Sequence, residues 1–443
     1  DSLMLIRFRC SNFRSIRDEQ ELSLVANSDT SLPENVIEDP ALGSVRLLRS
    51  AAIYGANASG KTNVLNAMDF MKDFVRRSHA HTGPSDPIPV VPFALDKESS
   101  KQPSKFDLDF VQSGVRTNYG FTVDQNNVLS EWLFLYPKNQ PRKVFVRKLA
   151  NNGDNEYDFG STLKGAKSTI RQLTRRNSLF LSAAAQSAHP LLTPIYDWFS
   201  EGVSVALPER RRIAATNAAS AVFTDKEMKE NVLKLLKVAE TGIEEIEIDE
   251  NEFDEEIKSD VRLDSDIDAD GFIGRNTFLR RIRESVGAAD DFGLRTRSAL
   301  RFLHKNADHE AGAYLKLLDE SRGTQNLFCL SVPILESIEL ERALVVDEIE
   351  ASMHPIVARN LLHLFSAGDM PRRGQLIFTT HDTNLLDQEI LRRDQIWFTE
   401  KDSRGRTHLY PLTDFKPRKH ESLEKGYLKG RYGAIPYPGE IRL

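Results

Sequence analysis

The clearest periodic pattern in the chain lies between residues 61 and 78, in KTNVLNAMDFMKDFVRRS. Apolar residues recur there at spacings of three and four, which is the period of one face of an α-helix. These residues are Val64, Leu65, Met68, Met71 and Val75. The segment before it, LLRSAAIY (47–54), is a mostly apolar run of strand length. The pattern predicts a buried strand, a short loop and an amphipathic helix.

Two later apolar runs predict strands that are buried on both faces. Residues 344–346 run directly into Asp347, and residues 376–378 end shortly before His381. Continuous apolar runs of this length are typical of parallel sheets that are covered by helices. We therefore expect an α/β fold in which polar residues gather at the carboxyl edge of a parallel sheet.

The long segment between these strands has two patterns. Short alternating stretches separated by turn residues fill 106–160 and predict an antiparallel β-meander. Helical spacing follows from 161, most clearly in TDKEMKENVLKLLKVAET (224–241), where Thr224 or Asp225 is the expected N-cap. No heptad repeat is sustained, so we expect no long coiled coil. The predicted division is an N-terminal lobe (1–160), a helical insertion (161–310) and a C-terminal lobe (311–443).

Composition narrows the class of protein without naming its chemistry. The chain has 443 residues, of which 40% are hydrophobic and 28% charged, and its net charge is −6. No global basic field would draw it to nucleic acid. Cys10 and Cys329 form no disulfide or metal spacing, which suits a reducing compartment. No apolar run approaches the roughly 18 residues of a membrane span, and no secretory signal begins the chain, so we expect a cytoplasmic protein.

The predicted loop carries a phosphate-binding motif. Its residues are Gly55, Ala56, Asn57, Ala58, Ser59, Gly60, Lys61, Thr62 and Asn63, and the first eight match G-x-x-x-x-G-K-[ST]. The two glycines let successive backbone N–H groups point at phosphates, and Lys61 adds a positive charge. The Thr62 hydroxyl is a ligand for Mg²⁺. A loop of this kind between a strand and a helix predicts a nucleotide triphosphate site.

The acidic pair after the strand at 344–346 is the expected second half of this site. Asp347 would hold Mg²⁺ through water, as the second acidic motif does in phosphate-loop enzymes. Glu348 would point away from Asp347 along an extended chain and could poise the attacking water. His381, at the end of the next predicted strand, could hydrogen-bond the γ-phosphate and sense its loss.

A second anion site is predicted in DESRGTQNLFCLSVPILES (319–337). Ser321 and Thr324 can cap a mostly apolar helix that Pro333 interrupts, and Gly323 allows a ligand to approach the backbone. Together with Gln325 these residues form S-x-G-x-Q, which by itself fits an ordinary capped helix equally well. Its place after the phosphate loop and just before the acidic strand favours the anion site. Since one chain already has one phosphate cradle, a second one suggests that it serves the nucleotide of another copy.

In motif order the chain resembles the ATP-binding-cassette ATPases of the SMC-like branch, of the AAA_15/AAA_21 type. The similar segments are GANASGKTN, ESRGTQ, LVVDEIEASMHP, FTTHD and the opening LIRFRCSNFRSIRDEQELSLVA (5–26). RRDQIWFTEKD (392–402) and GYLKGRYGAIPYPGE (426–440) look more narrowly like the AbiLi/RloA ATPases of abortive infection. The family's Q-loop falls in 90–110, where Gln102 is a candidate without a clear motif.

The resemblance implies an ATPase head whose two copies sandwich two ATP molecules with Mg²⁺. Lys61 and Thr62 would contact phosphates and Mg²⁺, Asp347 would hold Mg²⁺, and Glu348 would be the general base. Ser321, Gly323, Thr324 and Gln325 would contact ATP in trans, with His381 as the γ-phosphate switch. The implied role is the sensor subunit of a bacterial anti-phage system, with a nuclease-like effector encoded nearby as its partner.

Two other classes of function remain open at this point. A DNA-repair ATPase would bind DNA directly through arginine patches, of which Arg280, Arg281 and Arg283 are the best candidates. The rival patches are Arg210, Arg211 and Arg212, and Arg171, Arg175 and Arg176. A scaffold would bind ATP without useful turnover.

Overall fold

The computed structural model of the protein describes residues 3–249, 297, 299–305, 312–351, 353–366, 374–418 and 421–435. The chain forms two compact units. The first consists of Asp1–Val205, Ile338–Ile349 and Arg359–Leu443, and the second of Ala206–Ser337 and Glu350–Ala358. In the described part of the chain no helix is both long and apolar enough to cross a membrane.

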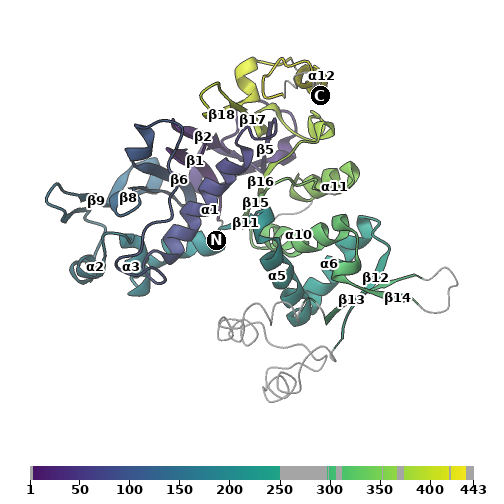
Figure 1. Ribbon diagram of the computed structural model, residues 1–443, viewed down its shortest axis with the longest axis horizontal. Helices are drawn as coiled ribbons and strands as arrows, with labels where there is room; N and C mark the ends of the chain where they lie inside the picture. Colours follow the sequence, from purple (N-terminus) through teal and green to yellow (C-terminus); the bar gives the residue numbers. More distant parts are fainter. Residues whose placement is uncertain are drawn as a thin grey trace. The chain divides into compact units, whose positions relative to one another are not determined.

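A six-stranded sheet in the order β11-β15-β16-β5-β17-β18 organises the first unit (Figure 1). Its strands are β11 (Val203–Ala206), β15 (Ala343–Val346), β16 (Gln375–Thr379), β5 (Ser50–Gly55), β17 (Ile396–Lys401) and β18 (Thr407–Pro411). β15, β16, β5 and β17 are parallel, and β18 turns back antiparallel to β17. The strands predicted at 344–346 and 376–378 are therefore confirmed as neighbours. The strand predicted at 47–54 is confirmed only from residue 50, where β5 begins beside β16, because residues 47 and 48 belong to a separate strand.

An antiparallel sheet of seven strands, in the order β10-β9-β8-β7-β6-β1-β2, belongs to the same unit. Its strands are β1 (Leu5–Ser11), β2 (Gln20–Ser23), β6 (Ser104–Gln112), β7 (Val115–Val123), β8 (Val128–Tyr136), β9 (Arg142–Leu149) and β10 (Asn155–Phe159). The predicted β-meander is confirmed, and β1 extends it by pairing with β6. A small antiparallel pair, β3 (Val36–Glu38) and β4 (Arg46–Leu48), also belongs to this unit.

Four helices of the first unit are α1 (Lys61–Arg77), α2 (Lys167–Leu173), α3 (Phe180–Gln186) and α4 (Thr193–Glu201), followed near the C-terminus by α12 (Leu423–Leu428). The five apolar residues that predicted α1 are all buried. Phe70 and Phe74 of the same helix pack on Phe106 and Phe121 of the antiparallel sheet, with ring centroids 4.8 and 5.4 Å apart. The helix that starts at the predicted loop is thus fixed by an aromatic core.

The second unit contains α5 (Arg211–Thr224), α6 (Lys226–Val238) and a three-stranded sheet of β12 (Ile243–Ile248), β13 (Leu300–His304) and β14 (Ala313–Lys316). Asp225 caps α6 as expected, because its carboxylate accepts a hydrogen bond from Met228 N at 3.0 Å. The sheet corrects the expectation that this segment is helical throughout. In β12 isoleucine and glutamate partly alternate over IEEIEI, which is a strand period and not a helical one.

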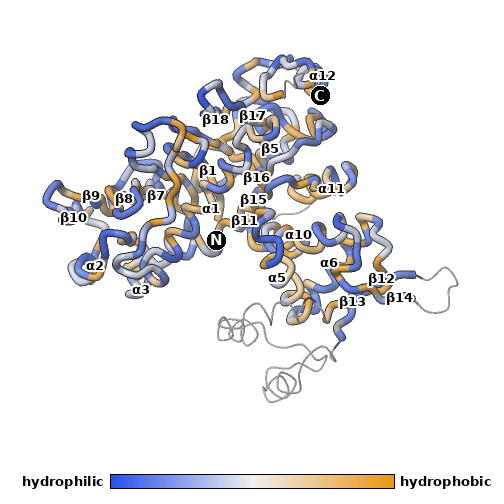
Figure 2. Tube along the Cα trace, viewed as in Figure 1, coloured by the Kyte–Doolittle hydropathy of each residue, from blue (hydrophilic) through white to orange (hydrophobic). Residues whose placement is uncertain are grey.

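Two further helices, α10 (Arg322–Glu339) and α11 (Pro355–Ser366), follow that sheet in the sequence. The expected interruption at Pro333 is wrong, since α10 continues through this residue. Proline costs a helix interior about 3 kcal/mol, through one lost hydrogen bond and a clash with the carbonyl four residues earlier. Val332 and Ile334 on either side of it are buried, and this packing stabilises the helix. Much of α10 is orange in Figure 2, in agreement with the apolar helix that was predicted.

A buried carboxylate fixes the start of α3 against the antiparallel sheet. Glu131 and Arg147 have fully buried side chains, and their Oε2 and Nη1 atoms lie 3.4 Å apart. The Glu131 carboxylate also accepts hydrogen bonds from Phe180 N (2.7 Å) and Leu181 N (2.9 Å). Burial raises the pKa of Glu131, and Arg147 and the two N–H groups oppose the rise.

Glu131→Ala is expected to lower the free energy of unfolding by about 3–5 kcal/mol, because it leaves Arg147 buried without its partner. Urea unfolding followed by tryptophan fluorescence measures the change. The control is Asp158→Ala, which removes an exposed ion pair with Lys143 on the same sheet. That variant should lose less than about 1 kcal/mol. Equal losses in the two variants would contradict the argument from burial.

Candidate functional site

Three loops meet at the carboxyl edge of the parallel sheet, after β15, β16 and β5. In the register of these strands Val346 pairs with Phe378, and Thr379 pairs with Ile53. The acidic pair, His381 and the glycine-rich loop therefore leave adjacent strands at nearly the same level. Ligands bind at this edge in open α/β sheets.

The glycine-rich loop runs from the end of β5 to the start of α1. Ala58 (φ 60°) and Gly60 (φ 108°) both have left-handed backbone conformations. Left-handed residues of this kind turn successive N–H groups toward one point and make a nest for an anion. Asn57 and Ala58 are exposed at the tip of the loop, whereas Ser59 and Gly60 are buried behind it.

Lys61 is folded against the loop that precedes it. Its ammonium group donates to Gly55 O at 2.7 Å and to Ala56 O at 3.2 Å, and the residue is only 5% exposed. The positive charge is therefore held beside the nest. Asn63, the last residue of the predicted nucleotide loop, donates from its side-chain amide to Ser15 Oγ at 2.6 Å.

Thr62 and Asp347 meet across the two halves of the sequence. Thr62 Oγ1 donates to Asp347 Oδ2 at 2.9 Å. Thr379, at the end of β16, donates its hydroxyl to Asp347 Oδ1 at 2.5 Å. The same hydroxyl accepts from Glu348 N at 2.8 Å. Thr379 is thus a residue of the site that the sequence analysis missed, although it stands two positions before His381.

The Thr62 and Asp347 oxygens suit Mg²⁺, which binds one or two protein oxygens and fills its other positions with phosphate and water. In the described segments no group of three or more His, Cys, Asp or Glu side chains could hold a metal by itself. A metal at this edge would therefore depend on the nucleotide for most of its ligands.

Glu348 is exposed and has φ 51°. The extended backbone expected at this residue is wrong, because a left-handed turn sends the chain away from the strand. A non-glycine residue in this conformation costs roughly 1–3 kcal/mol, and such residues persist where surrounding contacts hold them, often at active sites. Here the bond from Glu348 N to Thr379 holds the turn. Asp347, by contrast, is buried.

His381 lies in the turn after β16 with an exposed side chain. The residues around it are fixed. Thr380 N donates to Ile53 O at 3.1 Å, and Asp382 accepts from Asn384 N at 3.0 Å. The imidazole is therefore presented from an anchored turn between the acidic strand β15 and the loop strand β5.

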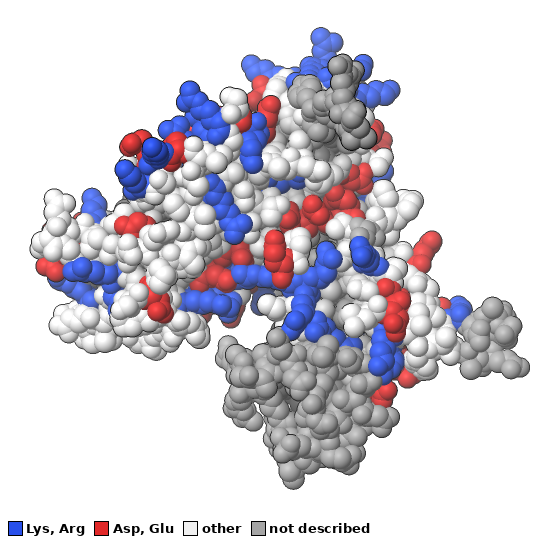
Figure 3. Space-filling model, in the orientation of Figure 1, with Lys and Arg blue, Asp and Glu red and all other residues white. Residues whose placement is uncertain are grey.

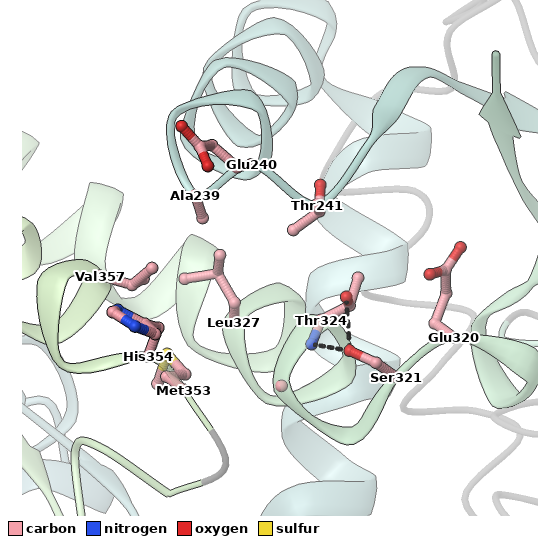
Figure 4. A pocket seen from close by; sticks show the side chains of 11 residues that line it. Ala239, Glu240, Thr241, Glu320, Ser321, Thr324, Leu327, Met353, His354 and Val357 are labelled. Carbon is pink, nitrogen blue, oxygen red and sulfur yellow. Dashed lines mark hydrogen bonds between the residues drawn. The ribbon is translucent and has the colours of Figure 1, made fainter.

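Ser321, Gly323, Thr324 and Gln325 lie at the start of α10, in the second unit. Ser321 caps the helix as predicted, since its hydroxyl accepts from Thr324 N at 3.1 Å. Ser321, Gly323 and Thr324 line a pocket of about 300 Å³ (Figure 4). Leu327, Met353, His354 and Val357 form its opposite, largely apolar side, and Asn326 beside it donates to Ala351 O at 2.7 Å. Gln325 does not line the pocket, and its side-chain amide donates to Glu320 O at 2.9 Å.

The remaining candidates have simpler surroundings. Gln102 is exposed, and its carbonyl accepts from Asn12 Nδ2 at 2.7 Å. The Arg175 guanidinium donates to the carbonyls of Ser78, His79 and Thr82 beyond the end of α1, so it closes that helix. The patch at 280–283 lies outside the described residues. Basic and acidic side chains are interspersed over the described part of the face in Figure 3.

Comparison with known proteins places this site in a family. The AAA_21 family, described as "AAA domain, putative AbiEii toxin, Type IV TA system", matches residues 50–387. The match contains the loop, the acidic pair and His381. No curated protein matches the chain.

Three solved structures resemble the chain at low identity. An SMC head bound to the C-terminal winged-helix domain of ScpA is 11% identical, with TM-score 0.42, covering 96% of this chain and 99% of that one. The SMC head domain from Thermotoga maritima is 12% identical, with TM-score 0.38 and coverages of 92% and 98%. An SMC head with an extended coiled coil, bound to ScpA from Pyrococcus furiosus, is 14% identical, with TM-score 0.34 and coverages of 97% and 99%.

Proposed function

Because the chain belongs to this AAA-domain family, we propose that it binds ATP at the loop 55–63 and hydrolyses it to ADP and phosphate. The observation that carries the proposal is the bond between Thr62 and Asp347, at 2.9 Å. It joins the phosphate loop to the acidic strand, as metal-assisted hydrolysis of a triphosphate requires.

Each residue of the site has a role that follows from its position. The nest at Ala58 and Gly60 binds phosphate oxygens, and Lys61 places its charge beside them. Mg²⁺, held by Thr62 and Asp347, would neutralise charge on the phosphates. Glu348 orients a water molecule and accepts its proton. The His381 imidazole, presented from its anchored turn, hydrogen-bonds the γ-phosphate and loses that partner after hydrolysis.

ATP would also join two copies of the chain. The Ser321 helix start supplies N–H groups and hydroxyls, and it is exposed enough to meet the triphosphate held by a second copy. The γ-phosphate then makes contacts in the closed pair that ADP cannot make. Such differential contacts are what any ligand-driven switch needs.

Ser321→Asp is expected to prevent ATP-dependent dimerisation while leaving ATP binding to the single chain intact. Aspartate still caps α10, but its negative charge opposes a triphosphate. Light scattering with and without ATP and Mg²⁺ measures the mass, and Ser321→Thr is the control that keeps the hydroxyl. A Ser321→Asp protein that dimerises with ATP like the parent would refute the trans contact.

The proposed biological role of the chain is that of a sensor subunit in an anti-phage system, in which it controls a nuclease-like effector. The words "putative AbiEii toxin" and "Type IV TA system" in the family description support a role in a toxin–antitoxin system, and the sensor role comes from the resemblance of the motifs. The test is to purify the chain with the product of the neighbouring gene and to measure whether ATP changes the mass of the complex. Tight binding of duplex DNA with a steep salt dependence would favour a DNA-repair ATPase instead.

A further inference from the structure

Two threonines of the β17–β18 hairpin reach the glycine-rich loop from behind. Thr399 Oγ1 lies 2.7 Å from Ser59 Oγ, and Thr407 Oγ1 donates to Ser59 O at 2.9 Å. Both threonines are buried. They come from positions more than 300 residues away in the sequence, and the proposed reaction gives them no role.

Thr407 is the end of a chain of hydrogen bonds whose direction can be derived. Its hydroxyl hydrogen goes to the Ser59 carbonyl, because a carbonyl can only accept. Ser15 Oγ, 2.7 Å from Thr407 Oγ1, must therefore donate to it. Ser15 Oγ in turn accepts from Asn63 Nδ2 at 2.6 Å, and Thr407 N donates to Ser15 O at 2.8 Å. The relay begins and ends on the phosphate loop segment and passes through two distant parts of the chain.

The Thr407 bond determines where the Gly60 N–H points. Ser59 C=O and Gly60 N–H belong to one trans peptide group, so they point in opposite directions. Holding the carbonyl against Thr407 turns the N–H away from the hairpin and toward the side on which the loop binds anions. Gly60 has φ 108°, and a Cβ there would lie 2.0 Å from Thr407 Oγ1. Thr407 thus occupies the space that the glycine leaves open.

We propose that Thr407 is a positioning residue of the phosphate loop, and that Ser15 acts through it. The pair orients the Ser59–Gly60 peptide so that the N–H is ready for a phosphate oxygen before nucleotide arrives. This inference rests on the proposed function, in which the loop binds ATP.

Thr407→Val is the direct test, because valine keeps the shape of threonine and removes only the hydroxyl. Titration calorimetry with ATP and Mg²⁺ should show affinity lowered about tenfold, the equivalent of one lost hydrogen bond. Thr407→Ser should restore the parental affinity. The matched control is Thr174→Val, since Thr174 is also buried and its hydroxyl donates to Ile170 O at 2.7 Å in α2. It should match Thr407→Val in melting temperature and bind ATP like the parent.

Ser15→Ala provides a second variant at a half-buried position, where folding is at less risk. It should also lower the affinity for ATP. If Thr407→Val does not fold, the affinity of Ser15→Ala alone tests the positioning role. Parental affinity in the folded hydroxyl-deletion variants would overturn the positioning role and leave the proposed ATP site standing. A parent protein that binds no ATP would overturn both.

Discussion

Replacing Lys61 with alanine is expected to abolish ATP binding. The Lys61 ammonium is held beside the nest by Gly55 O and Ala56 O, so it is placed to contact the phosphates in the proposed complex. A charged hydrogen bond is worth about 1.5–3 kcal/mol, so losing its contacts with two phosphates should weaken binding at least about a hundredfold. Titration calorimetry with ATP and Mg²⁺ measures the change.

Lys72 provides the control for this experiment. It lies on the same helix, and its ammonium donates to a backbone carbonyl, that of Val203, at 2.6 Å. Lys72→Ala should therefore disturb α1 to a similar extent while leaving ATP affinity unchanged. If both variants lost binding, the cause would be the folding of α1. Parental affinity in Lys61→Ala would refute the assignment of the loop.

The parts of the site that could be predicted are those whose residues lie close together in the sequence. The loop 55–62 carries its glycines, lysine and threonine within eight residues, and the apolar runs on either side of it read as strand and helix. The acidic strand and the strand before His381 could also be predicted. A strand that is buried on both faces is a continuous apolar run, which can be read from its own residues without knowing the neighbouring strand. The gathering of their polar ends was expected from the rule that ligands bind at one edge of a parallel sheet, whereas the strand order came from the structure.

What could not be predicted depends on pairs of residues that are distant in the sequence. Thr379 binds both Asp347 and Glu348 N, and Thr407 binds Ser59, but an isolated threonine carries no signal of its partner. The left-handed conformation of Glu348 could not be predicted either, because it depends on the same distant threonine, Thr379. Glutamate does not favour it, and the bond to Thr379 imposes it.

The C-terminal segments resemble the AbiLi/RloA ATPases, but the sequence predicted no functional role for their residues. In 392–402 and 426–435 the structure supplies a packing explanation. Phe398 stacks on Tyr427 and Tyr432 at centroid distances of 5.5 and 5.7 Å. Arg392 and Gln395 are buried, and they form hydrogen bonds to Ser31 O and Ser50 O. These residues support β17, which carries Thr399 toward the loop.

Glu348→Gln is expected to lower ATP hydrolysis by about 10²–10⁴-fold, the usual contribution of a general base. Glutamine has the same shape, and its backbone N–H can still bond to Thr379, so the left-handed turn and the Asp347 carboxylate beside it should remain in place. ATP binding is then retained while turnover stops, and the ATP-bound pair of chains should accumulate. A phosphate-release assay measures the first effect, and light scattering in ATP and Mg²⁺ measures the second.

The control for this variant is Glu389→Gln, because the Glu389 side chain is 83% exposed and belongs to the same unit without contacting the site. It should hydrolyse ATP like the parent. The two readouts of Glu348→Gln separate the remaining possibilities. Parental hydrolysis would remove Glu348 as the base. Lost hydrolysis with assembly unchanged from the parent would favour a scaffold that binds ATP without useful turnover. Lost hydrolysis in a protein that stays monomeric with ATP would keep the base and remove the ATP-closed pair, because a trapped triphosphate is what should hold the two copies together.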